Sequence, residues 1–433
     1  MEPTVQAPGR LMSDTLAAKW AELVTQALLV LLVPRALGPA AYGEFAVAFA
    51  VVSVLSLGLG LGAPLAAVRY IPAAGPHERL AQARAVAANV ARSRARILGA
   101  LTVAALVVVP AFLDVPPAVT AAVCLAAWCS VGSSIASELG LALGRPRLWN
   151  ARFPLENGLV VAAAPAGYAV AGEHGAIAGL LLATTITFGV LFAGVARELR
   201  EAPPGIPLPP QAVTYARFQT GTVILGTLVQ RGGPLAMPLA GASSTQTGFA
   251  AIATGLGAAG ATTMMSLLIV QLPGLVSRGL DRPDDAEQEA ANSARAALLV
   301  ALAAGLPAAL LAGPAIDRLL GAEFADAHGA VALALPAVPL GAALGLAHLM
   351  ASLRVRPEIL TISWAAGGLV FAAVAAATIP AIDAEGASIA MSGGLLVTVL
   401  TATVLLGGRS MRAICLASVA GAALILGAGA LAA

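Results

Sequence analysis

The sequence predicts an all-α, polytopic membrane protein, and three observations lead to this fold class. Of the 433 residues, 59% are hydrophobic and only 11% are charged, and the mean hydropathy is +0.89. A soluble domain carries about 25% charged residues and needs a polar exterior. Charge-free runs of about 20 residues, the length a helix needs to cross a bilayer, recur along the chain. The arginines are also concentrated in alternate connecting segments.

Thirteen candidate spans follow one another along the chain. The run 232–277 carries no charge and holds the end of one span, a turn at GASSTQTG and a second span. The others lie near 15–34, 45–68, 97–113, 118–143, 154–172, 175–196, 296–316, 329–353, 359–382, 386–408 and 413–433. We expect a six-helix bundle at 1–212, a second at 213–408 and an extra helix at 409–433, which makes about 12–13 transmembrane helices.

Arginine indicates the orientation of these spans. If the N-terminus is cytoplasmic, 20 arginines fall in inside segments, whereas Arg35 and Arg318 alone fall in outside turns. Cytoplasmic loops carry an excess of Lys and Arg, so this distribution predicts a cytoplasmic N-terminus in the cell membrane. The net charge of +2 gives no indication of a nucleic-acid partner.

The turn between the first two spans reads RALGPAAYGEF, at 35–45. Gly38 and Pro39 are expected to end the first helix, because Pro cannot continue it and Gly tolerates the turn geometry. Gly43 permits a tight entry into the second helix. Tyr42 is expected at interface depth, where an amphipathic ring is favoured. A well-formed outer turn therefore explains each residue without a substrate contact.

The two halves of the chain also resemble each other weakly. VPRALG at 33–38 parallels MPLAGA at 237–242, and ARSRARIL at 91–98 parallels ANSARAAL at 291–298. Within these segments Pro34 and Pro238 lie 204 residues apart, and Arg94 and Arg295 lie 201 residues apart. A repeat of two six-helix halves, related by an axis along the membrane normal, is a common transporter plan.

The same turn carries a family resemblance. A first helix, the pattern R-x-L-G-P-x-x-Y-G-x-F and a second helix ending in VRYIP look like the N-terminal signature of the Wzx-type polysaccharide-biosynthesis flippases. These belong to the multidrug/oligosaccharidyl-lipid/polysaccharide exporter (MOP) superfamily. Further similar segments occur in order, at QLPGLVSRGLD (271–281), LLGAEFADAHGAVALALPAVPLG (319–341) and IPAIDAEGASIAMSGG (379–394).

The resemblance implies a MATE-like fold with two bundles around a central cavity. It also implies a function, the transfer of an undecaprenyl-pyrophosphate-linked sugar or oligosaccharide from the inner to the outer leaflet by alternating access. The implied partners are this lipid-linked substrate and membrane lipids, and a coupling ion, proton or sodium, remains open.

Arg231, in LVQRGGPLAMP, is the main candidate for substrate binding. It lies inside the seventh span and precedes Gly232, Gly233 and Pro234, which loosen a helix. Arginine suits bidentate phosphate binding, and the implied substrate carries a pyrophosphate. The alternative is a structural ion pair with Glu138 or Glu22. Many members of the family carry an acidic residue near this point, whereas Gln230 stands here, which weakens any claim of a cation site in this helix.

Three more intramembrane charges are candidates, because an ionisable group in a span faces a cavity by default. Lys19 and Glu22 share a face of the first helix and can pair, although Lys19 is also near enough to the cytoplasmic end to snorkel. Glu138 either faces the cavity or pairs with Arg145 at the boundary. Glu156, beside Arg152, is expected at the interface.

Nothing in the sequence indicates an enzyme. There is no phosphate loop, no metal-ligand set and no nucleophile with a base, so we expect no cofactor and no catalytic site. A drug or cation antiporter of the same superfamily is the nearest rival function, since fold alone does not fix function. A lipid II-type flippase is less favoured by thirteen rather than fourteen spans. A glycan polymerase or ligase is disfavoured by the short outer turns.

Overall fold

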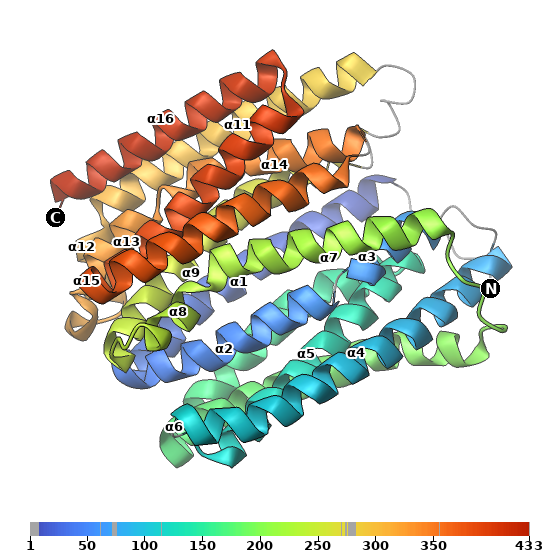
Figure 1. The fold of residues 1–433 in the computed structure, drawn as a ribbon, viewed down its shortest axis with the longest axis horizontal. Helices are drawn as coiled ribbons and strands as arrows, with labels where there is room; N and C mark the ends of the chain where they lie inside the picture. The colour runs from blue at the N-terminus through green and yellow to red at the C-terminus, as the bar shows by residue number, and fades with distance from the viewer. Residues whose placement is uncertain are drawn as a thin grey trace. The chain divides into compact units, whose positions relative to one another are not determined.

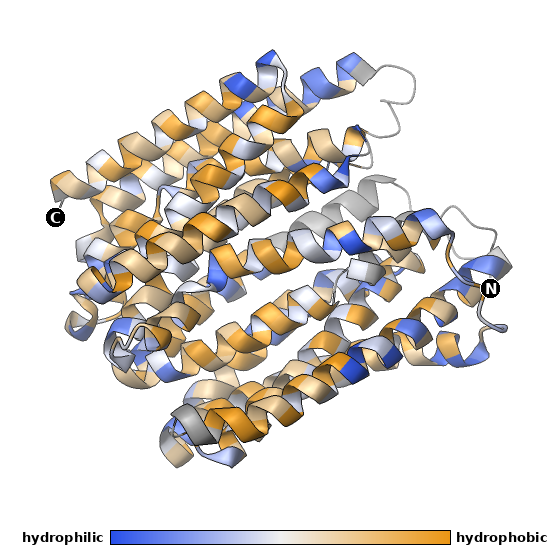
Figure 2. Cartoon of the chain, viewed as in Figure 1, coloured by the Kyte–Doolittle hydropathy of each residue, from blue (hydrophilic) through white to orange (hydrophobic). Residues whose placement is uncertain are grey.

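The computed structural model describes residues 8–60, 62–71, 76–113, 115–269, 271–272, 275, 283–354 and 356–432. Within these ranges every regular element is helical (Figure 1). Nine of the described helices are long and apolar enough to cross a membrane. Apolar residues run along helices such as α15 and α16, and hydrophilic residues gather toward their ends (Figure 2).

The chain divides into two compact units. Unit 1 comprises residues up to Val33 and Val51–Val223, and unit 2 comprises Pro34–Ala50 and Ile224–Ala433. Most of unit 1 is formed by α1 (Pro8–Leu37), α2 (Pro39–Gly60), α3 (Gly62–Tyr70), α4 (Pro76–Leu113), α5 (Pro117–Ala142), α6 (Pro146–Glu201) and α7 (Pro210–Arg231). The turn between α1 and α2 and the end of α7 belong to unit 2, so these three helices run through both units.

Unit 2 contains a series of shorter and longer helices. They are α8 (Gly233–Leu239), α9 (Ser244–Ile269), α11 (Pro283–Leu310), α12 (Ala312–Leu319), the 3₁₀ turn η2 (Ala322–Phe324), α13 (Ala327–Ala334), α14 (Ala337–Leu353), α15 (Pro357–Leu406) and α16 (Arg409–Ala432). The helices α13 and α14 form its centre, since most residues of the stretch Ala327–Leu353 are buried.

Proline begins most of the long helices. The ring fixes φ near its helical value, and the missing N–H would have no intrahelical partner at this position. Helices that start in this way are α1, α2, α4, α5, α6, α7, α11 and α15. The sequence therefore contains a local signal for where these helices start.

Two helices are hairpins of two spans. α6 is interrupted at Ala171 and Gly172, where φ/ψ is −141/24 and 61/−144. α15 is interrupted at Ile382 and Asp383, where φ/ψ is −141/23 and 45/−121. These breaks lie where the sequence separates 154–172 from 175–196 and 359–382 from 386–408, so the predicted span boundaries are confirmed.

Other boundaries differ from those predicted. The segment before the third predicted span and the span itself form one 38-residue helix, α4. The tenth predicted span is divided into α13 and α14 at Pro336, which has no N–H to continue the hydrogen-bond ladder, although φ/ψ at Leu335 and Pro336 stay helical. Periodicity and charge do not reveal such short interruptions within an apolar run.

The turn RALGPAAYGEF has the predicted break and a tight helix contact. α1 ends at Leu37, Gly38 has a φ of +77°, and α2 begins at Pro39. A Cβ atom on Gly43 would lie 1.8 Å from the carbonyl oxygen of Ser244, at the start of α9. Only glycine allows the two helices to approach so closely. The expectation that Gly43 serves a tight entry is thus explained by the contact of α2 with α9.

Candidate functional site

Arg231 is the last residue of α7, at a break within the predicted seventh span. Gly232 has φ −76° and ψ −15° and precedes α8, whose second residue is Pro234. The N–H of Gly232 still donates to the carbonyl of Leu228, at 2.8 Å. Proline cannot donate the next bonds of the ladder, so the helix is interrupted immediately after Arg231. The predicted loosening of the helix is therefore present.

The side chain of Arg231 is half-buried against aromatic residues at the start of α2. Its guanidinium carbon lies 6.0 Å from the centroid of the Phe49 ring. It also interacts electrostatically with Tyr42, which is 5% exposed and stacks on Phe45 at 6.4 Å between ring centroids. A guanidinium over an aromatic face is stabilised by the quadrupole of the ring. The turn that carries Tyr42 thus helps to form the surroundings of Arg231.

Gln230, the residue before Arg231, is held by a neighbouring helix. Its side-chain oxygen accepts a hydrogen bond from the Thr262 hydroxyl of α9, at 3.1 Å. A neutral amide in this place leaves Arg231 as the charged group at the end of α7.

Glu22 and Glu138, the proposed partners of Arg231, lie in unit 1 beside another arginine, Arg152. The carboxylates of Glu156, Glu138 and Glu22 all interact electrostatically with Arg152. Arg152 is only 3% exposed and Glu156 only 8% exposed, so both are buried in the helix bundle. Glu156 was expected at the interface, so its burial beside Arg152 differs from the prediction, and nothing in the sequence pattern indicated the cluster as a whole.

Hydroxyl groups and an indole complete the arrangement. The Arg152 guanidinium donates to Ser56 Oγ at 2.9 Å, and Ser130 Oγ donates to Glu156 Oε1 at 3.0 Å. Trp149 Nε1 donates to Glu138 Oε1 at 2.9 Å. We call these groups the Arg152 cluster, whose members are Glu22 of α1, Ser56 of α2, Ser130, Ser134 and Glu138 of α5, and Trp149, Arg152 and Glu156 of α6.

Two further predictions concern the partners of Glu138 and Lys19. Glu138 does not have Arg145 as its partner, because Arg145 forms an ion pair with Glu198 and donates to the carbonyl of Gly194 at 2.8 Å. The backbone of Lys19 lies in α1, but its side chain lies outside the described residues. Its predicted pairing with Glu22 therefore stays a prediction, as does the role of each candidate in binding substrate.

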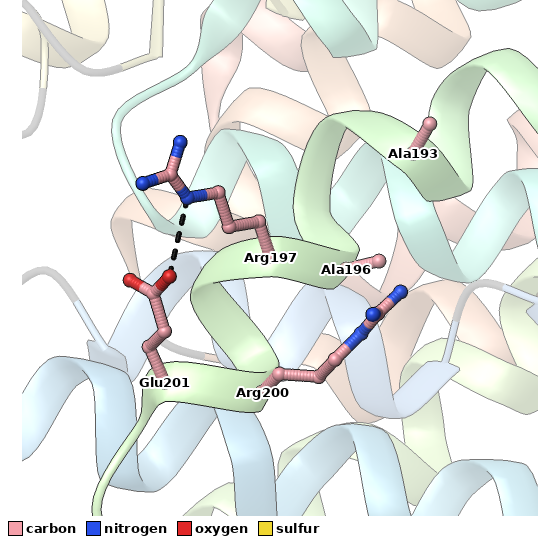
Figure 3. A pocket seen from close by; sticks show the side chains of 5 residues that line it. All are labelled: Ala193, Ala196, Arg197, Arg200 and Glu201. Atoms are coloured by element: carbon pink, nitrogen blue, oxygen red, sulfur yellow. Dashed lines mark hydrogen bonds and ion pairs between the residues drawn. The ribbon is translucent and has the colours of Figure 1, made fainter.

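A hollow of about 390 Å³ lies elsewhere in unit 1, at the end of α6. It is lined by Ala193, Ala196, Arg197, Arg200 and Glu201 (Figure 3). Arg197 is paired with Glu201 at 3.1 Å, and these side chains are 88% and 67% exposed. A solvent-exposed ion pair of this kind contributes little to the stability of the fold. None of the candidate substrate-binding residues lines this hollow.

Comparison of the whole structure with known proteins identifies its class. No family model matches the sequence, and no curated protein matches it significantly. The solved structure of the lipid II flippase MurJ, in an inward closed conformation, matches with a TM-score of 0.72 at 12% identity, over 94% of this chain and 90% of the other.

Multidrug transporters of the MATE family match as well. An inward-facing multidrug resistance MATE transporter of the MOP superfamily gives a TM-score of 0.62 at 16% identity, over 90% of this chain and 95% of the other. The Vibrio cholerae MATE transporter VcmN in its bent form gives 0.54 at 15% identity, over 94% and 99%. The chain is therefore an all-helical, multi-pass membrane protein. More particularly, it has the fold that MurJ and the MATE transporters share.

Proposed function

We propose that this protein is a transporter that flips an undecaprenyl-pyrophosphate-linked sugar or oligosaccharide from the inner to the outer leaflet by alternating access. The observation that carries the proposal is Arg231, a half-buried guanidinium at the break between α7 and α8, inside the predicted seventh span. The shared fold supports a transporter, and the turn that resembles the Wzx-type flippases supplies Tyr42 and Phe49 beside this arginine.

The chemistry of arginine suits the proposed ligand. An ionisable residue within a span is costly and marks a substrate pathway by default. The planar fork of arginine matches the oxygens of a phosphate in two parallel hydrogen bonds. The break after Arg231 places the guanidinium at the end of α7, next to Gly232 and Gly233.

The proposal is tested by substituting Arg231 in cells and measuring glycan export and protein abundance together. Arg231→Ala should abolish export while abundance and membrane insertion remain near normal. Arg231→Lys should restore export only in part, because an ammonium keeps the charge but loses the planar fork. Arg318→Ala, at an exposed arginine of α12 in the same unit, is the matched control and should export normally.

Two outcomes would contradict the substrate-binding role. Normal export by a well-expressed Arg231→Ala variant would exclude it. Low abundance with proportionately low export would instead indicate a structural ion pair, because removing the arginine would leave a buried carboxylate without its partner. Loss of drug efflux with intact glycan export would favour the rival function, an antiporter of the MATE type.

A further inference from the structure

Three arginines stand close together on α4, directly before the third predicted span. They are Arg92, Arg94 and Arg96, and the charge-free run that follows begins at Ile97. Figure 2 shows hydrophilic residues in the N-terminal half of α4 and apolar residues in the half that follows. Because α4 is one continuous helix across this change, its geometry sets the depth of the three arginines relative to the apolar run.

The three arginines lie at the depth of lipid headgroups. A helix rises by 1.5 Å per residue, so their Cα atoms lie within about 8 Å of Ile97 along the helix axis. The headgroup layer has a similar thickness, roughly 5–8 Å on each side of the hydrocarbon core. The Cα–Cβ bonds of a helix tilt toward its N-terminus, which in α4 is directed away from the apolar run. The guanidinium groups therefore extend toward the level of the lipid phosphates.

Arg94 lies on the face of α4 that packs against the rest of unit 1. Val86, Val90 and Leu98 are 7%, 3% and 3% exposed, and Arg94 belongs to this row, whose members are four residues apart. Val86 and Val90 pack in a buried cluster with Leu139 of α5. The side chain of Arg94 is half-buried, so it begins in a helix–helix interface and ends at the surface.

The charge of Arg94 has no partner in the described part of the chain. Its Nε atom is buried and has no hydrogen-bond acceptor there. No described carboxylate forms an ion pair with Arg94, nor with Arg92 or Arg96 on either side. A buried N–H of a charged group without an acceptor is costly. An arginine in this apolar row therefore indicates an acceptor that comes from outside the protein.

The carboxylates of the helices that pack against α4 have contacts elsewhere. α4 packs mainly on α5, with α3 and α6 beside it, and α3 contains no acidic residue. Glu138 of α5 accepts a hydrogen bond from Trp149. The acidic residues of α6 bond to Ser130, follow the break at Gly172, or pair with arginines at the end of the helix; they are Glu156, Glu173, Glu198 and Glu201.

An apolar face continues directly from Arg94 into the predicted span. Ile97 and Leu101 follow Arg94 by three and seven residues, so the three side chains share one face of the helix. Ile97 is 39% exposed and Leu101 is 44% exposed. A ligand that fits this face has a negative charge at one end and an apolar chain at the other.

We propose that Arg94, flanked by Arg92 and Arg96, binds the phosphate of one anionic phospholipid, whose acyl chain lies along Ile97 and Leu101. A guanidinium donates two parallel hydrogen bonds to phosphate oxygens, and basic sites beside membrane helices recognise such headgroups. A zwitterionic lipid fits less well, because its ammonium group would face the same positive charges. The site belongs to unit 1 and does not depend on the proposed transport, whose candidate residue Arg231 lies in unit 2.

Native mass spectrometry of the purified, delipidated protein tests this site without a transport substrate. The protein is titrated with phosphatidylglycerol or with phosphatidylcholine of the same acyl chains. An arginine near the surface contributes a factor of about five to the binding of an anionic lipid, so we expect phosphatidylglycerol to bind at least about tenfold more tightly. Arg94→Leu should remove this preference and still fold, because leucine continues the row of Val90 and Leu98.

Other arginine variants separate the site from general attraction between charges. The double variant Arg92→Gln/Arg96→Gln should weaken the binding of phosphatidylglycerol by about fivefold for each arginine removed. Arg412→Leu is the matched control, because it removes an exposed arginine at the start of α16 and should leave the binding unchanged. Arg231→Ala should also leave it unchanged, which keeps this result distinct from a failure of the proposed function.

Three results would overturn the proposal. Equal affinity of the wild-type protein for the two lipids would do so, whatever the variants show. A folded Arg94→Leu variant that keeps the preference would also do so, and if this variant did not fold, unchanged binding by the double variant would decide in the same way. Displacement of the bound lipid by inorganic phosphate would show a site for a soluble anion, and the assignment to a phospholipid would be wrong.

Discussion

Asp383 has a backbone conformation that favours glycine. Among the described residues it is the non-glycine residue with positive φ, at +45°, and its ψ of −121° lies outside the left-handed helical region that Asp tolerates. The equivalent position in α6 is Gly172. Such a conformation costs of order 1–3 kcal/mol for a residue with a side chain.

Replacement of Asp383 by glycine should therefore stabilise the protein, by about 1 kcal/mol. The midpoint of thermal unfolding of the purified protein measures the change. The reverse substitution, Gly172→Asp, should lower this midpoint. If Asp383→Gly lowered the midpoint instead, the aspartate side chain would hold the turn by contacts that outweigh the backbone strain.

Arg354 joins three elements outside the membrane-spanning segments. Its guanidinium forms a bidentate pair with Glu287 of α11, with both N–O distances at 2.7 Å, and donates to the carbonyl of Leu406 at 2.6 Å. The hydrogen bonds that Arg354 donates to the Glu287 carboxylate raise the pKa of Arg354 above its usual value. Because the pKa of Arg354 is higher in the folded than in the unfolded protein, the charged arginine stabilises the fold fully at pH values below the unfolded pKa. This stabilisation is lost only as the pH rises through the folded pKa. Arg354 therefore stays charged across the neutral range.

Arg354→Lys should destabilise the protein by about 1 kcal/mol, because lysine cannot reproduce the bidentate geometry. Arg356→Lys is the control, since its pair with Glu358 is more exposed, at 56% and 35%, and should change the stability by less than about 0.5 kcal/mol. Chemical denaturation of both variants compares the two sites. Equal losses of stability in the two variants would show that the bidentate contact of Arg354 adds no stability beyond that of a single exposed ion pair.

Single residues were also where sequence reasoning was least complete. Arg231 is identifiable because it interrupts an apolar run and precedes Gly232, Gly233 and Pro234. Arg152 lies near a predicted helix start, among other arginines, and looks like an ordinary cytoplasmic charge. Its i, i+4 relation to Glu156 was a usable signal, but its burial depends on Ser56 and Ser130 of helices distant in sequence.

At the level of elements, glycine sets how closely the two arms of each hairpin pack. In α15, a Cβ on Gly367 would lie 2.5 Å from the carbonyl oxygen of Gly394 on the other arm. A Cβ on Gly393 of the same helix would meet nothing within 4 Å. Gly367 therefore packs closely against Gly394 on the other arm, whereas Gly393, the neighbour of Gly394, faces open space.

Gly367→Ala should destabilise the protein by about 1–3 kcal/mol, because the added methyl forces the arms apart. Gly393→Ala should be neutral or stabilising by up to about 1 kcal/mol, since alanine has the higher helix propensity. Thermal unfolding of the two variants side by side measures both. A larger loss for Gly393→Ala than for Gly367→Ala would contradict the close packing within α15.

The elements themselves were largely predictable. Long apolar runs and N-terminal prolines specify the spans, and Gly38 and Pro39 specify the end of α1. The break at Pro336 was harder to place, because the flanking residues are as apolar as those of a continuous helix. The likeness between the breaks of α6 and α15 was missed because it lies in backbone conformation, and residues as different as Gly172 and Asp383 occupy the equivalent positions.

For the whole molecule, the arginine distribution predicts which loops face the cytoplasm. A cysteine at Pro203, which is exposed between α6 and α7, should be shielded from an impermeant thiol reagent in intact cells. A cysteine at Asp383, at the break of α15, should be labelled. The background should lack Cys124, Cys129 and Cys415, which are free thiols. Labelling of Pro203→Cys from outside would reverse the orientation of every loop.

Flipping by the purified protein tests the central claim most directly. The protein is reconstituted into vesicles that contain a fluorescent undecaprenyl-pyrophosphate-linked oligosaccharide, and an impermeant quencher reports how much label reaches the other leaflet. We predict that wild-type protein accelerates this transfer over protein-free vesicles, that Arg231→Ala does not, and that a fluorescent phospholipid is not moved. Transfer no faster than in protein-free vesicles, or equal movement of the phospholipid, would contradict the assignment as a flippase for lipid-linked glycans.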